Sequence, residues 1–313
     1  MSLELVLGGL GLTALGVYAC QPKSGPLASL PGDVPAADAT VVLPASGGPT
    51  RYRYAHCGSG HLIVLVPGIS YPMELYEPLF NALTNASRAV LMYDVTGRGF
   101  SHTSGEPLTV DLCMQQLLEL LEALKIPPDT RLSLVGWSMG SCIVTRFAER
   151  FSARVEKLVL LGPVGAVVSK KPATAMLLHV PLGIGNALAK LVMPGTLKKL
   201  YRAELGDHPI VDYLCDHATR NPSLVRTIVS TLRHFKEIDD NRATLSTVGG
   251  DERWRGKILV MWATNDGTVT REGIDATMAL MPGAILHVVD GEQHAFFVTK
   301  PEACNPHIVD FLR

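Results

Sequence analysis

The chain alternates between short, continuously apolar runs and longer stretches with helical periodicity. Leu62–Val66 is apolar at every position, which is typical of a strand buried on both faces of a sheet. The stretch after Pro72 carries its apolar residues at helical spacing, and Thr109 precedes a second such stretch that ends before Pro127. This alternation predicts an α/β fold, with a mostly parallel twisted sheet and helices on both of its faces.

Further strands are expected in other short runs rich in β-branched and apolar residues. The first two, which Pro44 to Thr50 separate, are interpreted as an opening hairpin. The expected strands besides Leu62–Val66 are Ala39–Leu43, Arg51–Ala55, Ala89–Tyr93, Leu132–Val135, Lys157–Leu161, Lys257–Trp262 and Ala284–Val289.

One interval breaks this rhythm, because no buried strand is apparent between Gly162 and Trp254. Its pattern is helical instead, at Thr174–Leu182, Asn186–Val192 and Leu224–Phe235. We interpret about 166–254 as a helical cap inserted into a folded domain that spans residues 39–313.

The N-terminal segment, residues 1–20, is interpreted separately from the folded domain. Leu5–Cys20 is almost wholly apolar, and its sixteen residues would span about 24 Å as a helix, against roughly 30 Å of membrane hydrocarbon. No Lys or Arg precedes it, unlike the start of a secretory signal. The pattern favours membrane association through residues 5–20, and a cleaved signal or a segment packed on the protein are the alternatives.

The residues around this apolar stretch predict its orientation. Glu4 precedes it and Lys23 follows it, and positive charge is enriched on the cytosolic side of a membrane span. We therefore expect the folded domain in the cytosol, joined to the anchor by a proline-rich linker at residues 21–38. Gly9, Gly11 and Ala14 match a dinucleotide-binding fingerprint, but the preceding strand is too short for that interpretation.

Composition excludes several classes of protein. Hydrophobic residues make up 47% of the 313 positions and charged residues 18%, which excludes a disordered chain. The net charge of −1 gives no reason to expect a nucleic-acid partner. The six cysteines lack regular spacing, so we expect buried thiols and neither disulfides nor a zinc site.

A catalytic nucleophile is expected at Ser138. The pentapeptide Gly136–Gly140 has the pattern GxSxG, follows the expected strand Leu132–Val135 and opens a helical stretch, Ser141–Phe151. In that context the serine occupies a tight strand-to-helix turn, where flanking glycines leave room for it. The helix N-terminus also favours negative charge beside the serine.

A serine needs a base that an acid orients, and in this kind of fold both follow it along the chain. Asp266 lies just beyond the expected strand Lys257–Trp262, and His294 lies just beyond Ala284–Val289. Both therefore belong to the edge of the sheet where open α/β sheets bind ligands. Asp290 and Glu292 are nearby alternatives for the acid.

These residues resemble the α/β-hydrolase superfamily, specifically its cap-bearing serine hydrolases, which include monoacylglycerol lipases, esterases and carbon–carbon bond hydrolases. The resemblance covers about residues 50–313. It rests on Pro67-Gly68 after a strand, Asp94 to Ser101 with Gly97-Arg98-Gly99, Gly136 to Gly140, Asp266 with Val269, and His294 with Pro301.

The resemblance implies an oxyanion hole made by the backbone N–H groups of Ile69 and Met139. One departure is visible, because the family usually has His-Gly where this chain has Pro67-Gly68. A backbone donor survives that change, but the side-chain hydrogen bonds that order the loop are in question. The triad chemistry needs no metal or organic cofactor.

Two other groups of polar residues are interpreted as structural. Asp94 and Arg98 could be taken for a second catalytic pair, but the favoured interpretation is a side chain that caps the turn Gly97-Arg98-Gly99. His208 and His217 fall on opposite faces of a helix and are expected on a solvated polar surface, not at a metal.

The cap carries the clue to the substrate. Met176, Leu177 and Leu182 lie in apolar helical stretches that either pack on the sheet or line an acyl-chain pocket, with Trp137 as a further substrate contact. We expect a serine hydrolase of carboxylic esters with a small-molecule or lipid-like substrate, such as a monoacylglycerol.

Alternatives of the same fold remain open. A carbon–carbon bond hydrolase would keep the triad, and so would a peptidase or amidase, which would hold a substrate amine with Glu204, Asp207 or Asp212. A non-catalytic binding protein would be expected to have lost part of the triad.

Overall fold

The computed structural model describes residues 39–45, 47–56, 60–103, 107–167 and 184–313. Within them an eight-stranded sheet has the order β1-β2-β4-β3-β5-β6-β7-β8. The strands are β1 (Ala39–Leu43), β2 (Gly48–Ala55), β3 (His61–Val66), β4 (Ala89–Tyr93), β5 (Arg131–Trp137), β6 (Val155–Leu161), β7 (Ile258–Ala263) and β8 (Ile285–Val289). The pairs β1–β2 and β2–β4 are antiparallel and the others parallel, which confirms the mostly parallel sheet and the opening hairpin.

Helices fill the intervals between the strands. They are α2 (Glu77–Asn85), α3 (Val110–Ala123), α4 (Met139–Arg150), α5 (Ile184–Leu205), α6 (Ile210–Arg220), α7 (Pro222–His234), α8 (Arg242–Gly250), α9 (Arg271–Leu280), α10 (Phe296–Thr299) and α11 (Pro301–Phe311). The expected cap of α3 is confirmed, since the Thr109 side chain accepts a hydrogen bond from the backbone N–H of Leu112.

The stretch after Pro72 differs from the single helix that its periodicity predicts. A 3-10 helix, Met73–Tyr76, comes first, and α2 begins at Glu77. Pro78 explains the break, because in a continuous α-helix its ring would clash with the carbonyl of Glu74. The apolar positions are nevertheless buried as expected.

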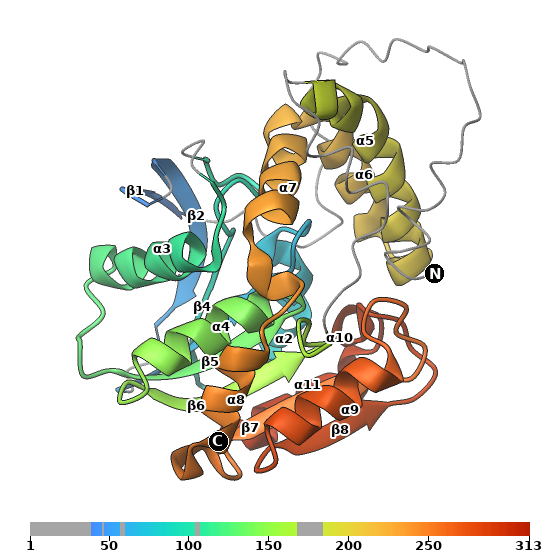
Figure 1. The fold of residues 1–313 in the computed structure, drawn as a ribbon. Helices are drawn as coiled ribbons and strands as arrows, with labels where there is room; N and C mark the ends of the chain where they lie inside the picture. Colours follow the sequence, from blue (N-terminus) through green and yellow to red (C-terminus); the bar gives the residue numbers. More distant parts are fainter. Residues whose placement is uncertain (1–38, 46, 57–59, 104–106, 168–183) are drawn as a thin grey trace.

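Two helical layers cover the sheet (Figure 1). On one face α3, α4, α8 and α9 pack over strand residues such as Val64, Leu134 and Val260. On the other face α2, α10 and α11 cover Ile63, Val135 and others. Alternate residues of one strand therefore enter opposite cores, which explains why the central strands are mostly apolar.

The helices α5, α6 and α7 lie above the sheet, at one end of the molecule (Figure 1). They follow β6, and the described residues 184–254 contain helices but no strand. By contrast α8 packs against α4 and α9 in the layer beside the sheet. We use "cap" below for α5 to α7.

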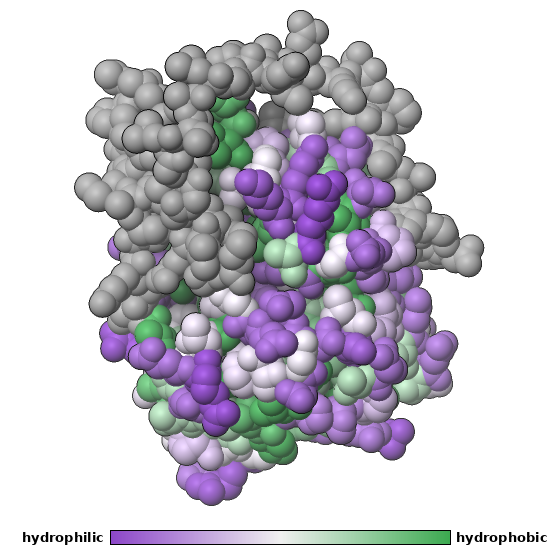
Figure 2. Space-filling model, turned by 90° about the vertical axis from the view of Figure 1, so that its right-hand side faces the viewer, coloured by the Kyte–Doolittle hydropathy of each residue, from purple (hydrophilic) through white to green (hydrophobic). Residues whose placement is uncertain are grey.

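Several expectations fall on residues outside the described ranges. They concern the apolar segment 5–20, the linker 21–38 and the substrate contacts Met176, Leu177 and Leu182. In the described part of the chain, no helix has both the length and the apolar character that a membrane span requires. On the face shown in Figure 2, the described surface mixes hydrophilic and hydrophobic side chains.

Candidate active site

Ser138 stands at the carboxyl end of β5, in a sharp turn that leads directly into α4. Its backbone has φ 53° and ψ −119°, a left-handed conformation that a non-glycine residue rarely adopts. The flanking glycines are a steric requirement. A Cβ on Gly136 would lie 2.5 Å from the carbonyl oxygen of Gly140, and one on Gly140 would lie 2.2 Å from that of Val66.

His294 and Asp266 meet at the same edge of the sheet, beyond β8 and β7. Nδ1 of His294 lies 2.7 Å from Oδ2 of Asp266, and both residues are buried. The other carboxylate oxygen, Oδ1, accepts hydrogen bonds of 2.8 Å from the backbone N–H groups of Thr268 and Val269. The carboxylate is therefore fixed in one orientation, with a single oxygen directed at the imidazole.

The end of β6 and the residue after it contact both Ser138 and His294. The Leu161 carbonyl accepts a hydrogen bond of 2.9 Å from the N–H of Ser138. A Cβ on the next residue, Gly162, would lie 2.9 Å from Cε1 of His294. Nε2 of His294 is buried without a hydrogen-bond partner among the described residues, and so is available to accept a proton. Catalytic hydrogen bonds are often long without substrate and tighten in the complex.

The electrostatics of His294 favour its protonated form. Burial lowers the pKa of the imidazole, but the charge and hydrogen bond of Asp266 and the charge of Glu204 outweigh burial and raise that pKa above its usual value. Glu204 lies in the last turn of α5 and is itself buried. Burial raises the pKa of Glu204, and the neighbouring His294 partly opposes that rise.

The loop after β3 holds the first expected oxyanion donor, Ile69, which is half-buried. Its N–H has no acceptor among the described residues. The second donor, Met139, is the first residue of α4, where the helix offers its N–H no acceptor. The structure therefore leaves both N–H groups available beside Ser138.

The cap orders this loop. Tyr201 on α5 donates a hydrogen bond of 3.0 Å to the Ser70 carbonyl, and the Tyr71 hydroxyl donates one of 2.5 Å to Glu204. The sequence pattern did not predict that Tyr71 and Tyr201 join the loop to the cap. Their signal was the pair of polar groups at positions 201 and 204, which lie on one face of a helix.

Other expected residues lie as follows. Trp137 was expected to contact the substrate. It is fully buried, and its indole N–H donates a hydrogen bond of 3.2 Å to the His294 carbonyl. In the described residues Trp137 therefore supports the histidine.

Asp94 caps its turn as expected, because it accepts hydrogen bonds from the N–H groups of Phe100 and Met73. Arg98 lies within that turn, and its side chain reaches the loop that holds Ile69.

The expected solvated surface at His217 is wrong. His217 is only 3% exposed, and its ring packs against those of Tyr213 and Phe100. The helix α6 therefore turns this histidine toward the core. The pattern of polar residues did not reveal this, because Phe100 approaches from a distant part of the sequence.

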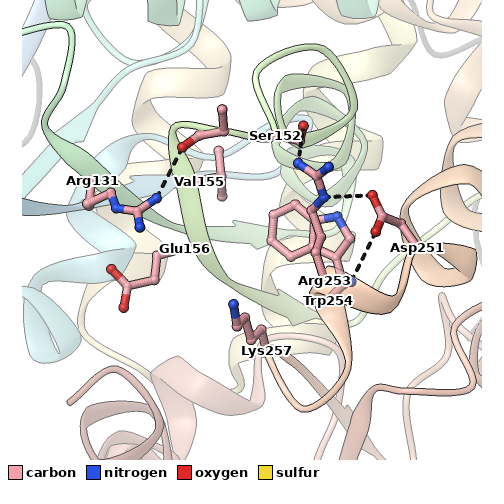
Figure 3. Close-up of a pocket in the computed structure, with 9 residues that line it drawn as sticks. Arg131, Ser152, Val155, Glu156, Asp251, Arg253, Trp254 and Lys257 are labelled. Carbon is pink, nitrogen blue, oxygen red and sulfur yellow. Dashed lines mark hydrogen bonds and ion pairs between the residues drawn. The ribbon is translucent and has the colours of Figure 1, made fainter.

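A surface pocket lies away from these residues (Figure 3). It is lined by the first residues of β5 and β6, the residue before β7 and the 3-10 helix Glu252–Trp254, and so lies at the opposite edge of the sheet from Ser138. Its Arg253 is engaged by Asp251 and by Ser152. Nothing in this pocket matches the chemistry expected at the carboxyl ends of the strands.

Comparisons with known proteins agree with this fold. An uncharacterized protein of Mycobacterium tuberculosis is 24% identical over 80% of this chain and 75% of its own length. The putative carbamate hydrolase RutD of a Caulobacter species is 25% identical over 85% of this chain and 93% of its own. The solved esterase of Exiguobacterium antarcticum is 19% identical, with a TM-score of 0.67, over 84% of this chain and 96% of that one.

The sequence pattern of one protein family matches residues 63–306, which run from within β3 to within α11 and include Ser138, Asp266 and His294. The observed sheet order, with the parallel strands β3 to β8 and helices on both faces, agrees with that match. The chain belongs to the Alpha/beta hydrolase family.

Proposed function

We propose that this hydrolase cleaves carboxylic esters through an acyl-enzyme on Ser138, and that its substrates are lipid-like, of the monoacylglycerol kind. The observation that carries the proposal is the bond of 2.7 Å between Asp266 and His294, whose Nε2 has no hydrogen-bond partner among the described residues. Ser138 stands in a strained turn at the same edge of the sheet. A serine, an imidazole and an anchored carboxylate in this order are the requirements of nucleophilic acyl transfer.

The reaction follows from the roles of these groups. Ser138 attacks the ester carbonyl while Nε2 of His294 takes the hydroxyl proton, which His294 then gives to the leaving alcohol. Asp266 keeps the proton on Nδ1 and stabilises the imidazolium. The N–H groups of Ile69 and Met139 bind the oxyanion, each contributing about 3 kcal/mol. Water activated by His294 then hydrolyses the acyl-enzyme.

The proposal of a lipid-like substrate rests on the apolar helical patterns at 174–182 and 186–192 and on the apolar residues 5–20. Membrane association through that segment, with the catalytic domain in the cytosol, remains a prediction.

A panel of p-nitrophenyl esters with acyl chains of increasing length tests the ester proposal. We expect kcat/KM to rise from the acetate to a medium or long chain, because each buried CH₂ contributes about 0.8 kcal/mol. If kcat/KM is highest for the acetate and declines steadily with chain length, the lipid-like substrate is contradicted and the protein is a short-chain esterase. Hydrolysis of a vinylogous 1,5-diketone with no ester hydrolysis would instead identify a carbon–carbon bond hydrolase.

A second candidate function, amide hydrolysis, is favoured by one observation. Of the three acidic cap residues considered above, Asp207 and Asp212 are exposed, whereas Glu204 is buried close enough to His294 to affect its pKa. A carboxylate in that place suits a substrate amine. A higher kcat/KM for an aminoacyl arylamide than for the medium-chain ester would identify the protein as an amidase.

The pH dependence of kcat/KM should report the charge of Glu204. The base must be neutral, so activity should fall as the pH falls through the pKa of His294, at a pH above the ordinary value of a histidine. Glu204→Gln removes a negative charge that favours the imidazolium, so the acidic limb of the profile should move to lower pH. Asp207→Asn, an exposed carboxylate nearby, is the matched control and should leave the limb unmoved. Equal profiles for Glu204→Gln and the parent would contradict this electrostatic role.

A further inference from the structure

Arg98 is a fully buried arginine that the proposed mechanism does not yet use. It follows β4, within Gly97-Arg98-Gly99, and its side chain extends beneath the active site. Nε donates a hydrogen bond of 2.9 Å to the Ile69 carbonyl, and Nη2 lies 3.5 Å from the sulfur of Met139. One side chain therefore contacts both residues whose backbone N–H groups form the expected oxyanion hole.

The remaining contacts of Arg98 are also to uncharged groups. Nη1 donates to the Thr96 carbonyl and Nη2 to the hydroxyl of Thr231 on α7, at 2.9 and 2.5 Å. Among the described residues no carboxylate forms an ion pair with this guanidinium. Burial lowers the pKa of Arg98 to about 10, so the group remains charged at neutral pH.

A buried charge without a counter-charge is costly, and such groups are uncommon unless they serve a purpose. Here the positive charge lies behind two N–H groups that would face a developing negative charge. A preorganised positive group in a water-excluded site stabilises an oxyanion without the cost of reorientation.

We propose that Arg98 is a positioning residue for the oxyanion hole, where it fixes the Ile69 loop and Met139 from below and adds a positive charge behind their N–H groups. This inference rests on the proposed function. This chain has Pro67-Gly68 where the family usually has His-Gly, so the side-chain hydrogen bonds of that histidine cannot order the loop. The loop is instead held by Arg98 on one side and by Tyr201 and Glu204 of the cap on the other.

The test compares Arg98→Met, which keeps an unbranched apolar stem but removes the guanidinium and its charge, with Arg98→Lys, which keeps the charge but loses the fork of donors. Three quantities are measured in the full chain. They are kcat and KM for the preferred p-nitrophenyl ester, and the affinity for an alkyl boronic acid, which forms a tetrahedral anion on the serine. For Arg98→Met we expect kcat and boronate affinity to fall together by about 10- to 100-fold, less than the loss of one donor itself. KM should change little, and Arg98→Lys should recover part of the loss.

Thr231→Val is the matched control, since it removes the contact between Arg98 and the cap but leaves the contacts with the loop. It should alter kcat and boronate affinity far less than Arg98→Met. Equal losses of kcat and boronate affinity in Thr231→Val and Arg98→Met would overturn the proposal. They would indicate that Arg98 only connects the sheet to α7. Unchanged boronate affinity in Arg98→Met would overturn it as well.

The two proposals can fail separately. A parent chain that binds the boronate but hydrolyses no ester would overturn the proposed substrate, while Arg98 would still be judged by boronate affinity. A parent that does neither would overturn the proposed function and, with it, the role of Arg98. If Arg98→Met does not fold, as a thermal melt would show, Arg98→Lys decides by the same parallel loss of kcat and boronate affinity.

Discussion

Replacing Ser138 by alanine should reduce the rate of ester hydrolysis by about a million-fold, as the loss of a triad nucleophile usually does. Folding should be nearly unaffected. Oγ of Ser138 makes no hydrogen bond to a described residue, and alanine keeps the Cβ that already occupies the strained turn with φ 53°. The measurement is kcat/KM of the purified variant, together with its melting temperature.

Labelling with a fluorophosphonate probe separates this loss from a misfolded site. The parent should be modified at Ser138 and the variant should not react. Ser133→Ala is the matched control, because Ser133 is also a buried serine, lies on β5 just before Ser138 and bonds to His61. If the parent and Ser138→Ala react equally with the probe, Ser138 is not the nucleophile.

The sheet was predictable from the sequence because its strands are defined locally. Most central strands are short apolar runs followed by a turn, because burial on both faces leaves few polar positions in them. The edge strand β8 was predictable as well. Its exposed positions include the apolar residues Ile285 and Val288, so its sequence is still a continuous apolar pattern around His287. The ends of strands were less certain, as with β2, which begins at Gly48 and not at Arg51.

The positions of Ser138, Asp266 and His294 at one edge were predictable for a related reason. Each follows a recognisable strand, and parallel strands bring their carboxyl ends together whatever the loops do. The structure places Asp266 and His294 in contact as this argument requires. Their catalytic roles remain predictions that the variants described here test.

The residues around these three could not be predicted, because their roles depend on contacts between distant segments. The hydroxyl of Tyr71 meets Glu204, which is 133 positions away in the sequence, and Arg98 meets Thr231 across the same separation. Hydrophobic periodicity determines which face of α5 is buried but not which loop it meets. The local pattern around Arg98 therefore indicated only a capped turn, while the long side chain in fact reaches Ile69 and Thr231.

Asp266→Asn should cost about ten-thousand-fold in rate while leaving the fold intact. Oδ1 of Asp266 accepts two hydrogen bonds of 2.8 Å from backbone N–H groups, so the amide oxygen of asparagine must take that place. Its NH₂ group then faces Nδ1 of His294, where a donor can be accommodated only if Nδ1 gives up its proton. The proton moves to Nε2, which can no longer accept one from Ser138.

Two carboxylates beyond β8 serve as matched controls, because each is bound elsewhere. Asp290 accepts a hydrogen bond from the Thr264 hydroxyl, and Glu292 accepts one from Thr299. Asp290→Asn and Glu292→Gln should therefore each lower kcat/KM by less than about tenfold, within the range of ordinary surface substitutions. If Asp290→Asn were the crippling change and Asp266→Asn nearly silent, the acid of the triad would be misassigned. The backbone bonds to Asp266 would then be only those of a turn, and the orientation of His294 would need another cause.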